Sequence, residues 1–198
     1  MKTSTIQHYA VCPTPLGDLL IGATDQGLAG AWFTEGQRDG PAPGSWGRTE
    51  PAHPVLAEAA RQLGDYFAGQ RGTFELPLDL SAGTDFQQSV WRALGDIAPG
   101  TSLSYGALAE RIGRPAAVRA VGTAVGANPL IIIVPCHRVL GQQGALTGFG
   151  GGLGRKASLL RIEGWQLDAD GLNDDALRRL RPSPPSAGAQ AALFAARH

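Results

Sequence analysis

Residues 104–128 have the sequence SYGALAERIGRPAAVRAVGTAVGAN, and this stretch predicts two short helices joined by a tight turn. The first helix begins at Ser104 and is closed by Gly113, and the second begins near Pro115. Such a pair is an ordinary αα-hairpin, which the spacing alone favours, or a helix-turn-helix that presents its second helix to nucleic acid.

The composition of the second helix favours the helix-turn-helix. Its residues are nearly all Ala, Gly, Val and Thr, although each internal glycine costs about 1 kcal/mol relative to alanine. Small residues let another backbone approach closely, either in the core or in a DNA groove. A helix this slim could enter the minor groove, which is roughly 6 Å wide. Arg119 is its one long cationic side chain.

The flanking residues predict that the pair belongs to a mainly helical second domain, residues 84–164. The segment TDFQQSVWRALGDI, residues 84–97, begins at a Thr or Asp cap, places four apolar side chains on one stripe and ends before Pro99-Gly100. The Pro- and Ser-rich residues 165–198 are expected to be a flexible tail.

Residues 1–83 predict a first domain of mixed α and β structure. Breaks at residues 13–17 and 25–27 divide its beginning into three short strands, expected to form an antiparallel meander. Pro54 opens a helix whose residues 56, 60, 63 and 67 share one face, and residues 74–84 have the pattern of an extended connector. The sequence therefore predicts an α+β protein with a small sheet followed by a helical domain.

Charge is distributed unevenly over a chain that is neutral overall. Residues 1–83 carry five Lys and Arg against nine acids, a net charge of −4, and residues 84–164 carry eight against four, a net charge of +4. This asymmetry fits a nucleic-acid face on the second domain, or only a solvated surface.

No apolar run is long enough to span a membrane and the first residues lack a secretion signal, so we expect a soluble, cytoplasmic protein. The two cysteines, Cys12 and Cys136, lie in unlike contexts, which disfavours a disulfide. Cys12 is expected to be structural or incidental. No zinc-ligand spacing is present, so no metal is expected.

The most apolar run of the chain ends in a cysteine. In IIIVPCHRVL, residues 131–140, the four β-branched residues predict a strand that stops at Pro135, with Cys136 at its tip. A cysteine behind such a run is by default buried and inert. His137 and Arg138 oppose that default, because a neighbouring cation favours thiolate and a histidine can act as a base.

The segment RAVGTAVGANPLIIIVPCHRV, residues 119–139, resembles the O6-alkylguanine-DNA alkyltransferases, also called methylated-DNA–protein-cysteine methyltransferases. The resemblance extends over residues 84–164, through LTGFGGGLGRKASLLRIEG, and more loosely over the first domain. It implies a ribonuclease H-like first domain, a winged-helix-like second domain, and repair of O6-alkylguanine, and of O4-alkylthymine, in double-stranded DNA bound by its minor groove. It also implies a monomer that flips the base out of the duplex and is consumed by one irreversible transfer, without a cofactor.

The resemblance implies five catalytic residues. Cys136 accepts the alkyl group, and His137 deprotonates it through a water. Glu163 orients His137. Tyr105 donates a proton or a hydrogen bond to guanine N3, and Asn128 fixes the turn before residues 131–134.

It also implies two binding surfaces. Arg119 fills the gap that the flipped base leaves in the duplex. The rest of the DNA-binding face is Ala120, Gly122, Thr123 and Ala127, and the guanine pocket is Val139, Phe149, Gly150 and Gly151. The sequence has Phe149 and Gly150 where some relatives have tyrosine and serine, which bears on substrate range more than on activity. A phosphate-binding loop is disfavoured because the glycine run lacks the Gly-Lys-Ser/Thr motif.

Three other functions are alternatives to the one that the resemblance implies. An alkyltransferase-like protein that only recognises the lesion is disfavoured because such proteins replace the acceptor cysteine. A Cys-His hydrolase brings its two residues together from distant segments. A transcription regulator would need a sensor domain, and none is visible.

Overall fold

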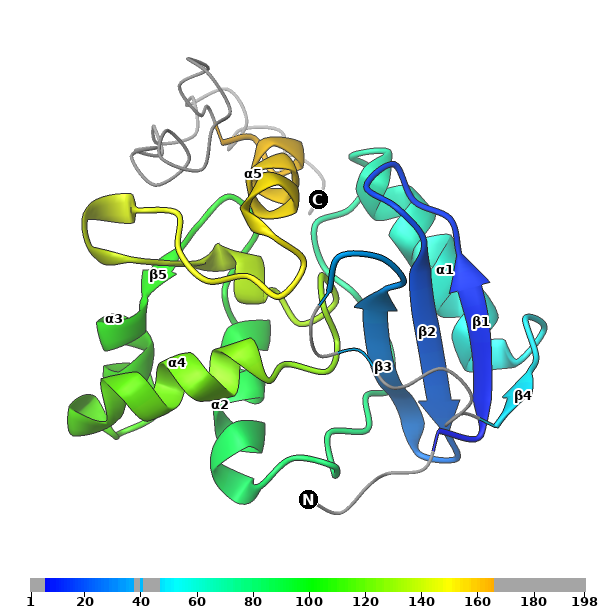
Figure 1. The fold of residues 1–198 in the computed structure, drawn as a ribbon, viewed down its shortest axis with the longest axis horizontal. Helices are drawn as coiled ribbons and strands as arrows, with labels where there is room; N and C mark the ends of the chain where they lie inside the picture. The colour runs from blue at the N-terminus through cyan, green and yellow to red at the C-terminus, as the bar shows by residue number, and fades with distance from the viewer. Residues whose placement is uncertain (1–5, 38–39, 41–46, 166–198) are drawn as a thin grey trace, which may run out of the picture.

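The computed structural model describes residues 6–37, 40 and 47–165. A small sheet covered by one helix forms one side of the molecule, and a group of short helices forms the other (Figure 1). The predicted α+β class is confirmed. One buried apolar cluster runs through both sides, from the sheet to the helices.

The sheet contains the predicted antiparallel meander. Strands β1 (His8–Cys12), β2 (Leu19–Thr24) and β3 (Gly27–Phe33) pair in sequence, and the short strand β4 (Arg48–Thr49) adds to β1 in parallel. The order is therefore β3-β2-β1-β4. Strand β4 was not predicted, because two residues inside a polar loop show no periodicity.

Helix α1 (Pro54–Phe67) packs against this sheet (Figure 1). Its buried stripe contains Leu56, Ala59, Leu63 and Tyr66, so the predicted face was only partly right: residues 60 and 67 are half-buried. The connector then runs beside β3, where Leu28 N donates to Pro77 O at 2.8 Å and Asp79 N to Leu28 O at 2.8 Å.

Helix α2 (Asp85–Gly95) begins the helical side. The side chain of Thr84 accepts a hydrogen bond from Gln87 N, and the Gln87 side chain accepts one from Thr84 N. This capping box fixes the start of the helix. Its buried residues include Val90, Trp91 and Leu94, and the Trp91 indole donates to Ala124 O at 2.8 Å.

The two predicted short helices are present. Strand β5 (Leu103–Ser104) leads into α3 (Tyr105–Arg111), whose N-cap Ser104 accepts a hydrogen bond from Ala107 N at 3.1 Å. Gly113 has φ 69°, the left-handed conformation that ends the helix. A 3₁₀ turn (Pro115–Ala117) precedes α4 (Val118–Gly126), so the second helix begins three residues later than Pro115.

The strand predicted for residues 131–134 is wrong. Leu130 makes one bridge to Ala31, and the next residues form a buried turn in which Ile132 has φ 72°. Val134 N donates to Leu130 O at 2.8 Å, and the Asn128 amide donates to Val134 O at 2.8 Å. The apolar run is buried in the core on all sides, so its hydrophobicity does not distinguish a strand from a turn.

Cys136 therefore begins a 3₁₀ helix (Cys136–Arg138) and does not cap a strand. Strand β6 (Val139–Leu140), parallel to β5, a further 3₁₀ helix (Gln142–Gly144) and helix α5 (Leu153–Ile162) follow. Trp165, where the tail was expected to begin, packs with Leu140, Leu146 and Leu160. The tail predicted beyond it, residues 166–198, lies outside the described residues.

Candidate active site

Helix α4 has one buried and one open face. Val121, Ala124 and Val125 point into the core, and Arg119 and Ala120 are exposed. The remaining residues predicted to bind DNA are exposed or half-buried and carry small side chains: Gly122, Thr123 and Ala127. The structure therefore places the predicted set along one accessible side of a slim helix.

Cys136 lies in the core behind this helix. Its thiol is free, and the residue is 6% exposed. Burial raises the pKa of the Cys136 thiol, and Asn128 and Lys156 act against that rise. The sequence pointed to His137 or Arg138 as the cation near the thiol. In the structure burial lowers the pKa of His137, and Arg138 is bonded to Glu163.

His137 and Glu163 form a buried pair. His137 Nε2 lies 2.8 Å from Glu163 Oε1, and the two side chains are 0% and 2% exposed. Burial acts to raise the pKa of Glu163, but the hydrogen bonds and charges of His137 and Arg138 hold it at about 2. The second ring nitrogen, His137 Nδ1, is buried and has no hydrogen-bond partner in the part of the chain that the structure describes.

Two further residues hold the Glu163 carboxylate, and neither was predicted. Arg138 donates to Oε1 from Nη2 at 2.7 Å and to Oε2 from Nε at 2.9 Å. The hydroxyl of Tyr66, from the first domain, donates to Oε1 at 3.0 Å. Arg138 directly follows His137, so its position in the sequence could have indicated a role at the site. Tyr66 is 97 residues from Glu163, and nothing in the sequence indicates their contact.

A third unpredicted residue, Lys156, is fully buried, and its charge acts on the thiol of Cys136. Its ammonium donates to Val139 O and to Thr147 O, each at 2.6 Å. Burial lowers the pKa of Lys156 to about 8, while its charge acts to lower the pKa of Cys136. Lys156 is thus a cation that acts on Cys136 and that the sequence did not point to.

Tyr105 and the residues predicted to line the guanine pocket differ in their exposure. Tyr105 is half-buried, and a side chain added at Gly148 would approach its hydroxyl to 3.0 Å. Burial is the largest cause of a raised pKa at Tyr105. Phe149 is half-buried, Gly150 is exposed, and Gly151 is buried with no room for a side chain against Phe33. The carbonyl of Val139 is bonded to Lys156.

Two family models match the chain. Residues 7–80 match the ribonuclease-like domain, and residues 85–165 the DNA binding domain, of 6-O-methylguanine DNA methyltransferase. The chain belongs to this family of methylated-DNA–protein-cysteine methyltransferases.

Relatives with that name are similar over most of the chain. The Methanosarcina acetivorans protein is 44% identical over 79% of this chain and 98% of its own length, and that of Mycobacterium bovis is 45% identical over 82% and 96%. A Mycobacterium tuberculosis OGT structure in complex with DNA is 45% identical, covers 79% of this chain and 92% of its own, and has a TM-score of 0.71.

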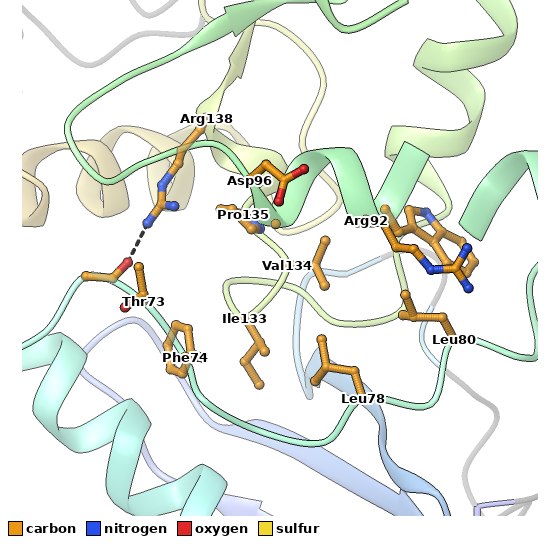
Figure 2. A pocket seen from close by; sticks show the side chains of 13 residues that line it. Thr73, Phe74, Leu78, Leu80, Arg92, Asp96, Ile133, Val134, Pro135 and Arg138 are labelled. Atoms are coloured by element: carbon orange, nitrogen blue, oxygen red, sulfur yellow. Dashed lines mark hydrogen bonds between the residues drawn. The ribbon is translucent and has the colours of Figure 1, made fainter. Parts of the chain in front are cut away.

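A cavity of about 320 Å³ lies beside residues 133–138 of this methyltransferase (Figure 2). Residues 72–74, 78 and 80 between α1 and α2 line it, together with the end of α2, residues 133–135 and Arg138, and Cys136 does not. Figure 2 shows Arg138 reaching across one end to the backbone of the connector. This cavity therefore adjoins the site through Arg138, but Cys136 does not line it.

Among the described residues no group of three His, Cys, Asp or Glu could hold a metal ion. No helix in the described part of the chain is long and apolar enough to cross a membrane.

Proposed function

We propose that this protein repairs DNA by moving the alkyl group of O6-alkylguanine, and of O4-alkylthymine, onto its own Cys136. The observation that carries the proposal is a buried thiol in the residue directly before His137, whose ring is bonded to the buried Glu163 carboxylate at 2.8 Å. A DNA-complexed relative of 45% identity supports DNA as the partner. We assign the chemistry to residues 84–164, with residues 1–83 as their support.

The first step is removal of the thiol proton. His137, whose pKa is lowered by burial, is neutral near pH 7 and can accept a proton. We propose that a water joins its Nδ1 to the sulfur, since Nε2 is directed at Glu163. Glu163 fixes the ring and stabilises the imidazolium that forms.

The sulfur then attacks the alkyl carbon in line with the bond to O6. The S–C bond forms, the C–O6 bond breaks, and Tyr105 donates a proton to guanine N3, so that the base leaves neutral. Tyr105 later regains a proton from the His137 side, which balances the one lost by the thiol. The raised pKa of Tyr105 keeps its hydroxyl protonated until N3 becomes basic.

The lesion must leave the duplex to reach a thiol that is 6% exposed. We propose that α4 enters the minor groove with its face of Ala120, Gly122, Thr123 and Ala127, and that Arg119 fills the space left by the base. Val139, Phe149, Gly150 and Gly151 line the pocket that receives it. Asn128 acts by holding the turn before Pro135 through its bond to Val134.

A thioether is not hydrolysed under cellular conditions, so each molecule acts once. The displacement is redox neutral and its acceptor is the chain's own sulfur, so the reaction as written uses no cofactor. We further propose that the protein acts as a monomer in the cytoplasm, on double-stranded DNA.

The test is to incubate the protein with a duplex containing O6-methylguanine and to measure the mass of the intact protein. We expect a gain of one methylene per molecule, located on Cys136 by peptide mapping. Cys12→Ser is the matched control, because the other free thiol is not the acceptor. Repeated turnover, or an unmodified Cys136 in folded protein, would contradict the proposal.

The base-flipping role of Arg119 has its own test. Arg119→Ala should slow repair of a duplex far more than reaction with free O6-benzylguanine, because only the duplex requires extrusion of the base. Arg114→Ala, an exposed cation before α4, is the control for general charge. An equal decrease in rate on the duplex and on free O6-benzylguanine would contradict the base-flipping role of Arg119.

A further inference from the structure

The hydroxyl of Tyr66 connects the first domain to the buried histidine pair. It donates to Glu163 Oε1 at 3.0 Å, and the residue is 0% exposed. The same oxygen lies 2.8 Å from His137 Nε2 and 2.7 Å from Arg138 Nη2. One carboxylate oxygen is thus shared by the histidine, the arginine and a side chain from helix α1.

The position of this hydroxyl is fixed by packing at the end of α1. The Tyr66 ring meets Phe67 edge-on and Phe74 at a tilt, each with ring centroids 5.5 Å apart. Close by, Arg138 Nη2 donates to Gly72 O at 2.7 Å (Figure 2). The end of α1 and the connector after it therefore hold both the carboxylate and the guanidinium.

Tyr66 can act only as a neutral donor. Burial raises the pKa of its hydroxyl well above the ordinary value, and the charge of Glu163 raises it further. The hydroxyl therefore stays protonated over the range in which His137 titrates. It exchanges no proton with the substrate, so its effect must pass through Glu163.

We propose that Tyr66 is a positioning residue for alkyl transfer: it holds the Glu163 carboxylate against His137 and limits how strongly that carboxylate attracts a proton to the ring. This inference rests on the proposed function. A hydrogen bond donated to a carboxylate oxygen stabilises its negative charge, and so weakens the pull of that charge on the neighbouring imidazolium.

The surroundings of His137 set the direction of the effect. Glu163 favours the protonated ring, whereas Arg138 on the same 3₁₀ helix and Lys156 on α5 oppose it, as does burial. The thiol of Cys136, the preceding residue, is neutral because burial raises its pKa. Removing the Tyr66 hydroxyl strengthens the one group that favours protonation, so the pKa of His137 should rise.

Tyr66→Phe in the full chain tests this, because it deletes the oxygen and keeps the ring. The assay is the rate of benzyl transfer from free O6-benzylguanine to Cys136, followed by intact mass between pH 5 and pH 9. The acidic limb of the pH–rate profile is the range in which His137 is partly protonated. There we expect the rate of Tyr66→Phe to be about fivefold below that of the wild type, and the limb to move to higher pH. The alkaline plateau should stay within about twofold of the wild type.

Phe67→Leu is the matched control. It alters the packing around the Tyr66 ring without removing a donor to Glu163, and its acidic limb should coincide with that of the wild type. Urea unfolding checks that both variants are folded, and rate constants are taken from the alkylated fraction only, so partial misfolding lowers the amplitude and leaves the limb in place.

Two results would overturn the inference: an unchanged pH profile for Tyr66→Phe, or a rate lowered equally at every pH, which a purely structural role predicts. Failure of the wild-type protein to alkylate Cys136 would instead contradict the proposed function. The two failures are distinguishable because only the second appears without any substitution.

Discussion

Replacing Glu163 with glutamine should destabilise the fold at neutral pH and remove part of its dependence on acid. The carboxylate is 2% exposed and accepts bonds from His137, Arg138 and Tyr66. Glutamine keeps the shape but not the charge, so the Arg138 guanidinium, 3% exposed, loses its buried counter-charge.

The size of the effect follows from the pKa of Glu163. A carboxyl whose pKa falls from its ordinary 4.5 to about 2 on folding contributes about 3 kcal/mol to the free energy of unfolding at pH 7. Removing one partner of a buried ion pair costs about 3 to 5 kcal/mol, which agrees. Because the folded-state pKa is the lower one, this stability is complete above pH 4.5 and is lost as the pH falls toward 2.

Urea unfolding of the wild type and of Glu163→Gln, followed by tryptophan fluorescence at pH 7, 5, 4 and 3, measures the difference. We expect the free energy of unfolding of Glu163→Gln to be about 3 kcal/mol below that of the wild type at pH 7, and this difference to decrease steadily below pH 4.5. Carboxyls that titrate alike in both proteins cancel in this comparison.

Glu58→Gln is the control for burial. Hydrogen bonds from Arg61 and Gln62 hold the pKa of Glu58 at about 2 as well, but its pair with Arg61 is exposed to solvent. Exposed pairs contribute little to stability, so the unfolding midpoint should hardly move. The reasoning is refuted if the two variants behave alike, or if the Glu163 deficit is the same at every pH.

Two other substitutions give separate predictions. Lys156→Met should slow benzyl transfer to Cys136 about tenfold at pH 7 by raising the pKa of the thiol further; the difference should shrink above pH 8, where Lys156 itself loses its charge. A constant ratio of rates from pH 6 to pH 9 would argue against this charge effect. Asn128→Ala removes bonds to Val134 O at 2.8 Å and from Leu130 N at 3.1 Å, and should lower the free energy of unfolding by about 2 to 3 kcal/mol in urea titrations. A loss below about 0.5 kcal/mol would show that the turn holds without this side chain.

The sequence correctly predicted those parts of the fold that depend on interactions between neighbouring residues. The caps at Thr84 and Ser104, and the glycine stop at Gly113, act within one helical turn and could be predicted from neighbouring residues. The meander was likewise marked by its own turns, and the small residues of α4 by composition alone.

The prediction from neighbouring residues failed for segment 131–134. Its β-branched residues fit a strand, but among the residues that the structure describes no strand pairs with them beyond the bridge at Leu130. The Asn128 amide closes the chain into a turn by bonding to Val134. Which partner a buried carbonyl finds depends on the surrounding fold, and a hydrophobic run does not encode it.

The sequence by itself determined the α+β class, the slim helix and the order Cys136-His137 followed by Glu163, because these depend on residue type and spacing. Only the tertiary structure decided which groups surround the thiol. Lys156 and Tyr66 come from α5 and from the first domain, and they meet the catalytic segment through packing over long sequence separations. The charge that acts to lower the pKa of Cys136 is that of Lys156, whereas burial lowers the pKa of His137 and Glu163 bonds to Arg138.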